Sequence, residues 1–116
     1  MSDKPLFWLG SSRSDLKTFP SDARRVAGFQ LRRVQQGLEA NDWKPMPTVG
    51  PSVQEIRIHT GLEHRVFYVA KFTEGVYVLH AFEKRTRKTS KRDMELARDR
   101  FRVLVMRRRT ESSKKR

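Results

Sequence analysis

The sequence predicts an α+β fold in which a small antiparallel β-sheet packs against N-terminal helices and is followed by a C-terminal helix. Three strand-like segments with short turns between them lie within residues 53–84. Segments with apolar residues at helical spacing lie on either side, at 21–38 and 90–106. At 116 residues the chain is long enough for one modest core. We therefore expect a single domain over residues 1–106 and a basic, irregular tail over residues 107–116.

The N-terminal third predicts one strand and two helices. Leu6–Leu9 is a short apolar run that ends at Gly10, which indicates a strand. Residues 11–19 predict a short helix that ends before Pro20, and Ser21 is a good N-cap for the next helix. The core-facing stripe of that second helix comprises Ala23, Val26, Ala27, Leu31, Val34 and Leu38.

Residues 42–52 predict a surface loop, because they contain three prolines and Gly50. The strands Val53–His59, Glu63–Phe72 and Val76–Lys84 follow as an antiparallel meander. We expect the helices to cover one face of this sheet and the other face to be open.

The C-terminal helix is predicted to begin after Ser90, because Ser90 and Asp93 have the spacing of a capping box. Its apolar stripe comprises Met94, Ala97, Phe101, Leu104 and Val105. From Arg107 onward no apolar face remains, so we expect residues 107–116 to be frayed or disordered.

The charge is strongly asymmetric along the chain. The formal net charge is +13, and residues 84–116 carry 15 basic and 4 acidic residues, a net +11. A small domain with such a surface indicates a polyanionic or acidic partner. There is no cysteine, which excludes disulfides and thiolate metal sites. The N-terminus has no signal pattern and no apolar run approaches membrane-helix length, so we expect a cytoplasmic protein without a membrane segment.

Cationic side chains are predicted to gather on the open face of the sheet. If Ile56 and Ile58 point to the helices, Arg57 and His59 point away from them. Arg65 then shares this face on the next strand. On the last strand Leu79 and Ala81 suit the core, which leaves a set of three side chains on the open side: His80, Phe82 and Lys84. A one-residue slip of register would invert this assignment.

Such a face is suited to cleaving RNA by attack of its own 2′-hydroxyl. Arginine and lysine can hold the crowded phosphate, histidine can exchange protons near neutral pH, and Phe82 can stack on a base. No metal-ligand spacing and no phosphate-binding glycine loop is present, so we expect neither a metal nor another cofactor. The alternative is structural: His80 and Phe82 pack in the sheet, while Arg57 and Arg65 pair with Glu55 and Glu63 across the hairpin.

Four segments carry a resemblance to a known family: Val53–Ile58, His64–Tyr68, Leu79–Thr89 and Lys91–Ala97. On these residues the chain resembles the HigB-like branch of the RelE/ParE superfamily of bacterial toxins, including phage-derived relatives. The resemblance extends from about Phe7 to Met106.

The resemblance implies the toxin of a type II toxin–antitoxin pair that cleaves messenger RNA on the translating ribosome. It implies a helix-turn-helix (HigA-like) antitoxin as protein partner, in a hetero-oligomer with the toxin. Carried over by position, Arg57, Arg65 and Lys84 correspond to the family's phosphate-handling cations, and His59, His80 and Phe82 are further transfers. We therefore expect Arg57, Arg65, Lys84 and His80 to be catalytic. The residues expected to bind RNA are His59, Phe82, Arg85, Arg87, Lys88 and Lys91.

Two alternatives stay open from the sequence. ParE-type members of the superfamily share the fold but act on DNA gyrase without cleaving RNA. A basic RNA-binding protein without catalytic activity would also explain the charge. Some members use a C-terminal tyrosine or histidine, but this chain has no Tyr after Tyr77 and no His after His80. The general base is therefore unassigned.

Overall fold

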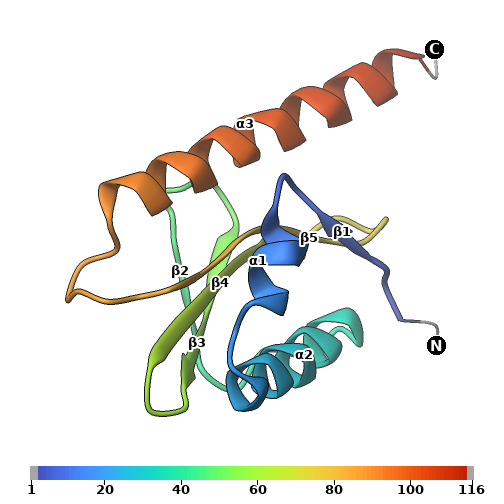
Figure 1. Ribbon diagram of the computed structural model, residues 1–116. Coiled ribbons are helices and arrows are strands. Elements are labelled where there is room, and N and C mark those ends of the chain that lie inside the picture. The colour runs from blue at the N-terminus through green and yellow to red at the C-terminus, as the bar shows by residue number, and fades with distance from the viewer. Residues whose placement is uncertain (1–2, 115–116) are drawn as a thin grey trace.

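A mixed five-stranded sheet with helices on both faces forms the molecule, and the computed structural model describes residues 3–114 (Figure 1). In chain order the elements are β1 (Leu6–Trp8), α1 (Ser12–Lys17), α2 (Ser21–Gln35), β2 (Trp43–Pro45), β3 (Val53–His59), β4 (Glu63–Val69), β5 (Val76–Glu83) and α3 (Lys91–Lys114). The strand order across the sheet is β1-β5-β4-β3-β2. The predicted α+β class and the β3–β4–β5 meander are confirmed.

The two edge strands differ from the prediction. β1 pairs with β5 in parallel, so the sheet is mixed and not purely antiparallel. Trp43–Pro45, placed by its prolines in a surface loop, forms β2 and pairs with β3 antiparallel. Its proline is tolerated because it ends a three-residue strand at the edge of the sheet, where a missing N–H group disturbs no central ladder.

Helices cover both faces of the sheet, which corrects the expectation of one open face (Figure 1). On one face α1 and α2 pack on a cluster that includes Ile56, Ile58 and Val66. On the other face α3 packs through Ala97 and Leu104. Both faces are apolar where they meet a helix. Alternation along the strands predicted the side of Ile56, Ile58 and Ala81 correctly, but not that a helix covers the other face.

A β-bulge in β5 changes the direction of one side chain. Phe67 pairs with His80 while Tyr68 pairs with Val78, so Leu79 has no partner on β4. Leu79 therefore points to the α3 face with His80, and the prediction that it lies with Ala81 on the α1–α2 side is wrong. A bulge has no clear sequence signal here, because no glycine marks it.

The helix ends mostly follow the sequence. Pro20, not Ser21, is the N-cap of α2. Leu38 lies beyond the end of α2 and is 50% exposed, so it does not extend the buried stripe. The capping box of α3 is confirmed, since the Asp93 N–H group donates to Ser90 Oγ at 3.1 Å.

The basic C-terminal segment is helical where an irregular tail was predicted. α3 continues to Lys114, and residues 115–116 lie outside the described residues. Arg108 explains part of the extension, because its Nε donates to Glu74 at 2.8 Å and its guanidinium lies 3.6 Å from the centre of the Phe72 ring. None of the helices in residues 3–114 is long and apolar enough to cross a membrane.

Candidate functional site

The β3–β4 hairpin and the end of β5 bring together the three predicted phosphate-binding cations. Arg57 and Arg65 are directly opposite each other in the β3–β4 register. The backbone N–H of Lys84 donates to the Glu63 carbonyl at 2.8 Å, which holds the residue beside the same hairpin. Strand alternation therefore predicted this cluster correctly.

The Arg65 guanidinium is buried between two carboxylates. It is 6% exposed, its Nη2 lies 3.0 Å from Glu63 Oε1, and its Nε lies 3.9 Å from Glu55 Oε1. The structural alternative, in which Arg65 pairs with Glu63 and Glu55, is correct for this residue. A buried guanidinium needs such partners, because an uncompensated charge in the interior is strongly destabilising.

Arg57 and His59 are joined through Asp42 and not through Glu55. Arg57 donates to Asp42 Oδ1 at 2.8 Å, and His59 Nε2 lies 2.8 Å from Asp42 Oδ2. His59 Nδ1 lies 2.7 Å from Glu63. The hydrogen bonds to Glu63 and Asp42 raise the pKa of the His59 imidazole, so its protonated, proton-donating form is favoured.

Glu55 is a functional candidate that the sequence did not single out. It is 1% exposed, and its other cationic neighbour, Lys44, lies 3.8 Å away. Burial raises the pKa of the Glu55 carboxyl, although Lys44, Arg65 and the nearby Lys84 and Arg57 oppose this shift. A carboxylate amid cations with a raised pKa is suited to accept a proton. The sequence signal that could have identified Glu55 is its position two residues before Arg57, which places both side chains on the same face of the strand.

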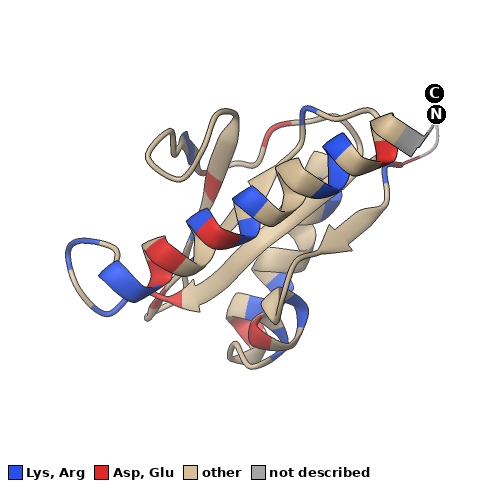
Figure 2. Ribbon diagram, turned by 90° about the horizontal axis from the view of Figure 1, so that it is seen from above, with Lys and Arg blue, Asp and Glu red and all other residues tan. Residues whose placement is uncertain are grey.

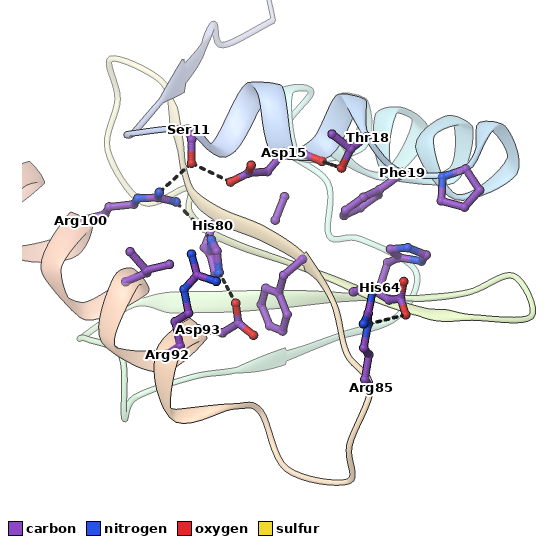
Figure 3. A pocket seen from close by; sticks show the side chains of 15 residues that line it. Ser11, Asp15, Thr18, Phe19, His64, His80, Arg85, Arg92, Asp93 and Arg100 are labelled. Carbon is purple, nitrogen blue, oxygen red and sulfur yellow. Dashed lines mark hydrogen bonds and ion pairs between the residues drawn. The ribbon is translucent and has the colours of Figure 1, made fainter.

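His80 lies in the interior instead of on an open face. It is 4% exposed; its Nε2 is 2.7 Å from Asp93 Oδ1 and its Nδ1 is 3.1 Å from Arg100 Nη1 (Figure 3). A guanidinium can only donate, so Nδ1 accepts and Nε2 carries the proton to Asp93. Burial lowers the pKa of the His80 imidazole. In this arrangement neither nitrogen is free to exchange a proton with a substrate.

Phe82 is a packing residue in this structure. Its ring stacks on His80 with 4.9 Å between centroids and meets Phe67 edge-on at 5.2 Å. The helix α3 packs on the same cluster. The expectation that His80 and Phe82 lie on an open face of the sheet is therefore wrong.

The connection from β5 into α3 is an exposed basic segment. Residues 84–92, which we call the basic loop, carry six cations and no acidic residue. In Figure 2 the ribbon is blue, the colour of Lys and Arg, along parts of this loop and at the first turn of α3. Within residues 3–114 its one ion pair joins Arg85 Nε to Glu83 Oε2 at 3.2 Å. The predicted RNA-binding residues that lie exposed in the loop and the first turn are Arg85, Arg87, Lys88 and Lys91.

In the described part of the chain, no group of three or more His, Asp or Glu side chains could hold a metal ion. The chemistry of the site is that of fixed cations beside a buried carboxylate and a proton-donating histidine. Such a set can bind a phosphodiester and move protons around it.

Comparison with known proteins assigns the family. A search of curated proteins finds none that matches this chain. A model of the phage-derived Gp49-like proteins matches residues 14–102, which include α2, all strands except β1, and the first half of α3. Gp49-like proteins are associated with RelE/HigB-type toxins. The chain therefore belongs to the family of phage-derived Gp49-like proteins.

Proposed function

We propose that this protein is the HigB-like toxin of a type II toxin–antitoxin pair and that it cleaves messenger RNA on the translating ribosome. The observation that carries the proposal is the position of the basic loop. In a member of a toxin-associated family, the loop leaves β5 beside Arg65 on β4, and Arg65 is directly opposite Arg57 on β3. A polyanion bound along the loop would pass over these cations.

In the proposed reaction the 2′-oxygen of one nucleotide attacks the adjacent phosphorus. The bond from phosphorus to the 5′-oxygen breaks, which leaves a 2′,3′-cyclic phosphate and a 5′-hydroxyl. One proton leaves the 2′-hydroxyl and one reaches the 5′-oxygen, so no metal or other reactant is required.

The proposed roles follow from the charge of each group and from its contacts. Lys84, which is half-buried, and Arg65 would contact the non-bridging oxygens, where negative charge builds up in the transition state. Glu55 would accept the 2′-proton, because its contacts with Lys44 and Arg65 are long and a substrate can compete for them. His59, kept protonated by its two carboxylates, would supply a proton to the leaving oxygen.

The proposed partners are the ribosome, messenger RNA and a helix-turn-helix antitoxin that neutralises the toxin in a hetero-oligomer, all in the cytoplasm. The net charge of +13 supports an RNA-rich target, since it favours association with polyanions.

A translation extract tests the proposal. Added protein should cut a translated message at defined codons, seen as primer-extension stops, and protein synthesis should cease. Lys84→Ala should lower the cutting rate by about 100-fold or more, because it removes a charge that stabilises the transition state. Arg25→Ala, an exposed cation on α2, is the matched control and should cut normally. Intact messages with normal translation would refute the proposal.

Glu55→Gln tests the proton acceptor separately. The substitution keeps the shape of the side chain but removes its basicity, so cutting should fall by about 100-fold to 10,000-fold and the acidic limb of the pH–rate profile should disappear. If the role of Glu55 is purely structural, Glu55→Gln should instead lower the melting temperature and leave the pH–rate profile of the residual activity unchanged.

A second candidate is a toxin without nuclease activity, acting on DNA gyrase. It is favoured by one observation: Arg57, Arg65 and His59 are already paired with carboxylates, and both nitrogens of His80 are engaged. Inhibition of gyrase supercoiling, with RNA left intact in the extract, would select this candidate.

A further inference from the structure

A cavity opens at the edge of the sheet between α1 and the start of α3 (Figure 3). β1 pairs with β5 only along Val76–Val78, so no strand covers the outer edge of β5 from Leu79 to Glu83. The cavity at this edge has a volume of about 640 Å³. It is distinct from the Arg57–Arg65 cluster, none of whose members line it.

The lining of the cavity combines donors with acceptors. Arg92 and Arg100 project from one side of α3, two turns apart, and Arg85 reaches in from the basic loop. Three carboxylates, those of Asp15, Glu83 and Asp93, lie among these arginines. A simple anion would be repelled by the carboxylates, whereas a group with both N–H donors and acceptors can pair with both kinds of side chain.

Flat rings give the cavity an apolar floor on both sides of β5. Phe19 lies against His64 with 4.3 Å between ring centroids, and His80 stacks on Phe82 at 4.9 Å. All four residues line the cavity. A planar ligand at the strand edge can pack against the accessible parts of these rings.

His64 carries an unsatisfied polar atom at this site. The residue is 1% exposed, and its Nδ1 has no hydrogen-bond partner within residues 3–114. Buried polar groups in folded proteins normally have a partner, so an unpaired one lining a cavity points to a ligand. Burial also lowers the pKa of the His64 imidazole, which leaves the ring neutral and able to accept or donate one hydrogen bond.

The strand edge adds backbone groups to the same wall. Hydrogen bonding alternates along an antiparallel ladder, and the Lys84 N–H donates toward β4. The N–H and C=O groups of Glu83 and Ala81 therefore point away from β4, toward the cavity. A row of alternating donors and acceptors at a strand edge can form hydrogen bonds with the polar edge of a planar heterocycle.

We propose that this cavity binds one unpaired nucleotide of the RNA, with its base against the β5 edge and its phosphate on Arg85 and Arg92. The choice of RNA as the source of the nucleotide rests on the function proposed above. Arg85 and Arg92 are exposed at the two ends of the basic loop, so the flanking phosphates of the strand would continue along the loop. The cavity would thereby give the toxin a preference for a particular base near the cut.

The experiment is a titration of the full chain labelled with ¹³C and ¹⁵N at histidine, followed by NMR. The probes are the four nucleoside 5′-monophosphates, ribose 5-phosphate and inorganic phosphate at constant ionic strength. At least one nucleotide should shift the ring signals of His64 and His80 in a saturable way, while the two base-free probes should not. Arg92→Ala should weaken this binding roughly tenfold, because it removes a charge-assisted hydrogen bond.

Arg109→Ala is the matched control, since Arg109 is an exposed cation of the same helix about 25 Å further along its axis. Equal shifts from inorganic phosphate would overturn the proposal in favour of a simple anion site. Absence of saturable shifts with every nucleotide, or equal losses in both variants, would also overturn it. Arg92 is exposed, so Arg92→Ala should keep the wild-type melting temperature.

The two proposals can fail independently. If nucleotides bind saturably but no cuts appear in the translation extract, the proposed nuclease activity is refuted and the proposed nucleotide site stands. If Arg92→Ala cuts RNA with an unchanged base preference and binds nucleotides as the wild type does, the proposed nuclease activity stands and the proposed nucleotide site is refuted.

Discussion

At the scale of single residues, the site shows why a cation on a strand face is seldom free. Arg65 is buried at the centre of the hairpin, where its desolvation must be offset by Glu63 and Glu55. The same pairing holds the guanidinium in one orientation, and a fixed donor group loses little entropy when it binds a phosphate. The ion pairs are therefore compatible with a binding role as well as a structural one.

Two buried histidines make the stability of the fold sensitive to acid. Burial lowers the pKa of the imidazoles of His64 and His80, so the folded state favours their neutral forms. The unfolded rings take up protons below about pH 6.5. Stability is therefore complete above that pH and falls as the pH decreases, by up to about 1.4 kcal/mol per pH unit for each proton.

This prediction is checked by urea unfolding followed by tryptophan fluorescence at pH 7.5 and 5.5. The free energy of unfolding should be lower at pH 5.5, and the difference should shrink in His64→Gln, whose side chain does not titrate. His59→Gln is the control: the pKa of its half-exposed ring is raised, so its contribution is lost with rising and not falling pH. Equal free energies at both pH values in the wild type would contradict the prediction.

At the scale of elements, the start of α3 connects a helix cap to the interior. Ser90 Oγ accepts from the Asp93 N–H and donates to Asp93 Oδ2 at 2.6 Å. The other oxygen of Asp93 accepts from His80. The Asp93 side chain thus connects the capping serine to the His80 ring, fixes the histidine tautomer and lines the cavity at the β5 edge.

Ser90→Ala should lower the free energy of unfolding by about 1 kcal/mol, the usual value of an N-cap side chain. It should also release one restraint on Asp93, so the His80 ring signals should broaden or shift. Thermal melts and histidine NMR check both effects. Ser112→Ala, at an exposed position late in the same helix, should change neither. A wild-type melting temperature in Ser90→Ala would mean that tertiary packing alone fixes the start of the helix.

At the scale of the whole molecule, elements that depend on local sequence patterns were predicted correctly, whereas contacts between distant segments were not. β3, β4 and β5 follow from alternation, and the opposition of Arg57 and Arg65 follows from one short turn between them. β1 was predicted as a strand, but its parallel pairing with β5 was not, because the two segments are distant in sequence. β2 was missed because three residues, one of them a proline, are too short for a periodic signal. The bulge at Leu79 has no local mark, although it decides which face that side chain occupies.

The same distinction between local and long-range information applies to the candidate site. Its cations lie on neighbouring strands and could be grouped from the sequence. The partners of Arg65, Glu55 and Glu63, lie on the same hairpin and could be predicted as well. Asp42, which pairs with Arg57, and Asp93, which pairs with His80, could not, because both reach the sheet through tertiary packing. The enclosure of His80 likewise depends on α3 crossing the sheet, which no pattern within β5 encodes.

The asymmetric charge gives the last prediction, the salt dependence of RNA binding. If the six cations of the basic loop replace counterions on a single strand, the plot of log affinity against log salt should have a slope of up to about −4. Fluorescence anisotropy of a labelled RNA with the Glu55→Gln variant, between 50 and 400 mM KCl, measures it without cleavage. Neutralising Arg87 and Lys88 to glutamine should reduce the slope by about 1.4. The same change at Arg24 and Arg25 on α2 is the control, and an equal reduction there would mean that RNA is bound by diffuse charge and not by the loop.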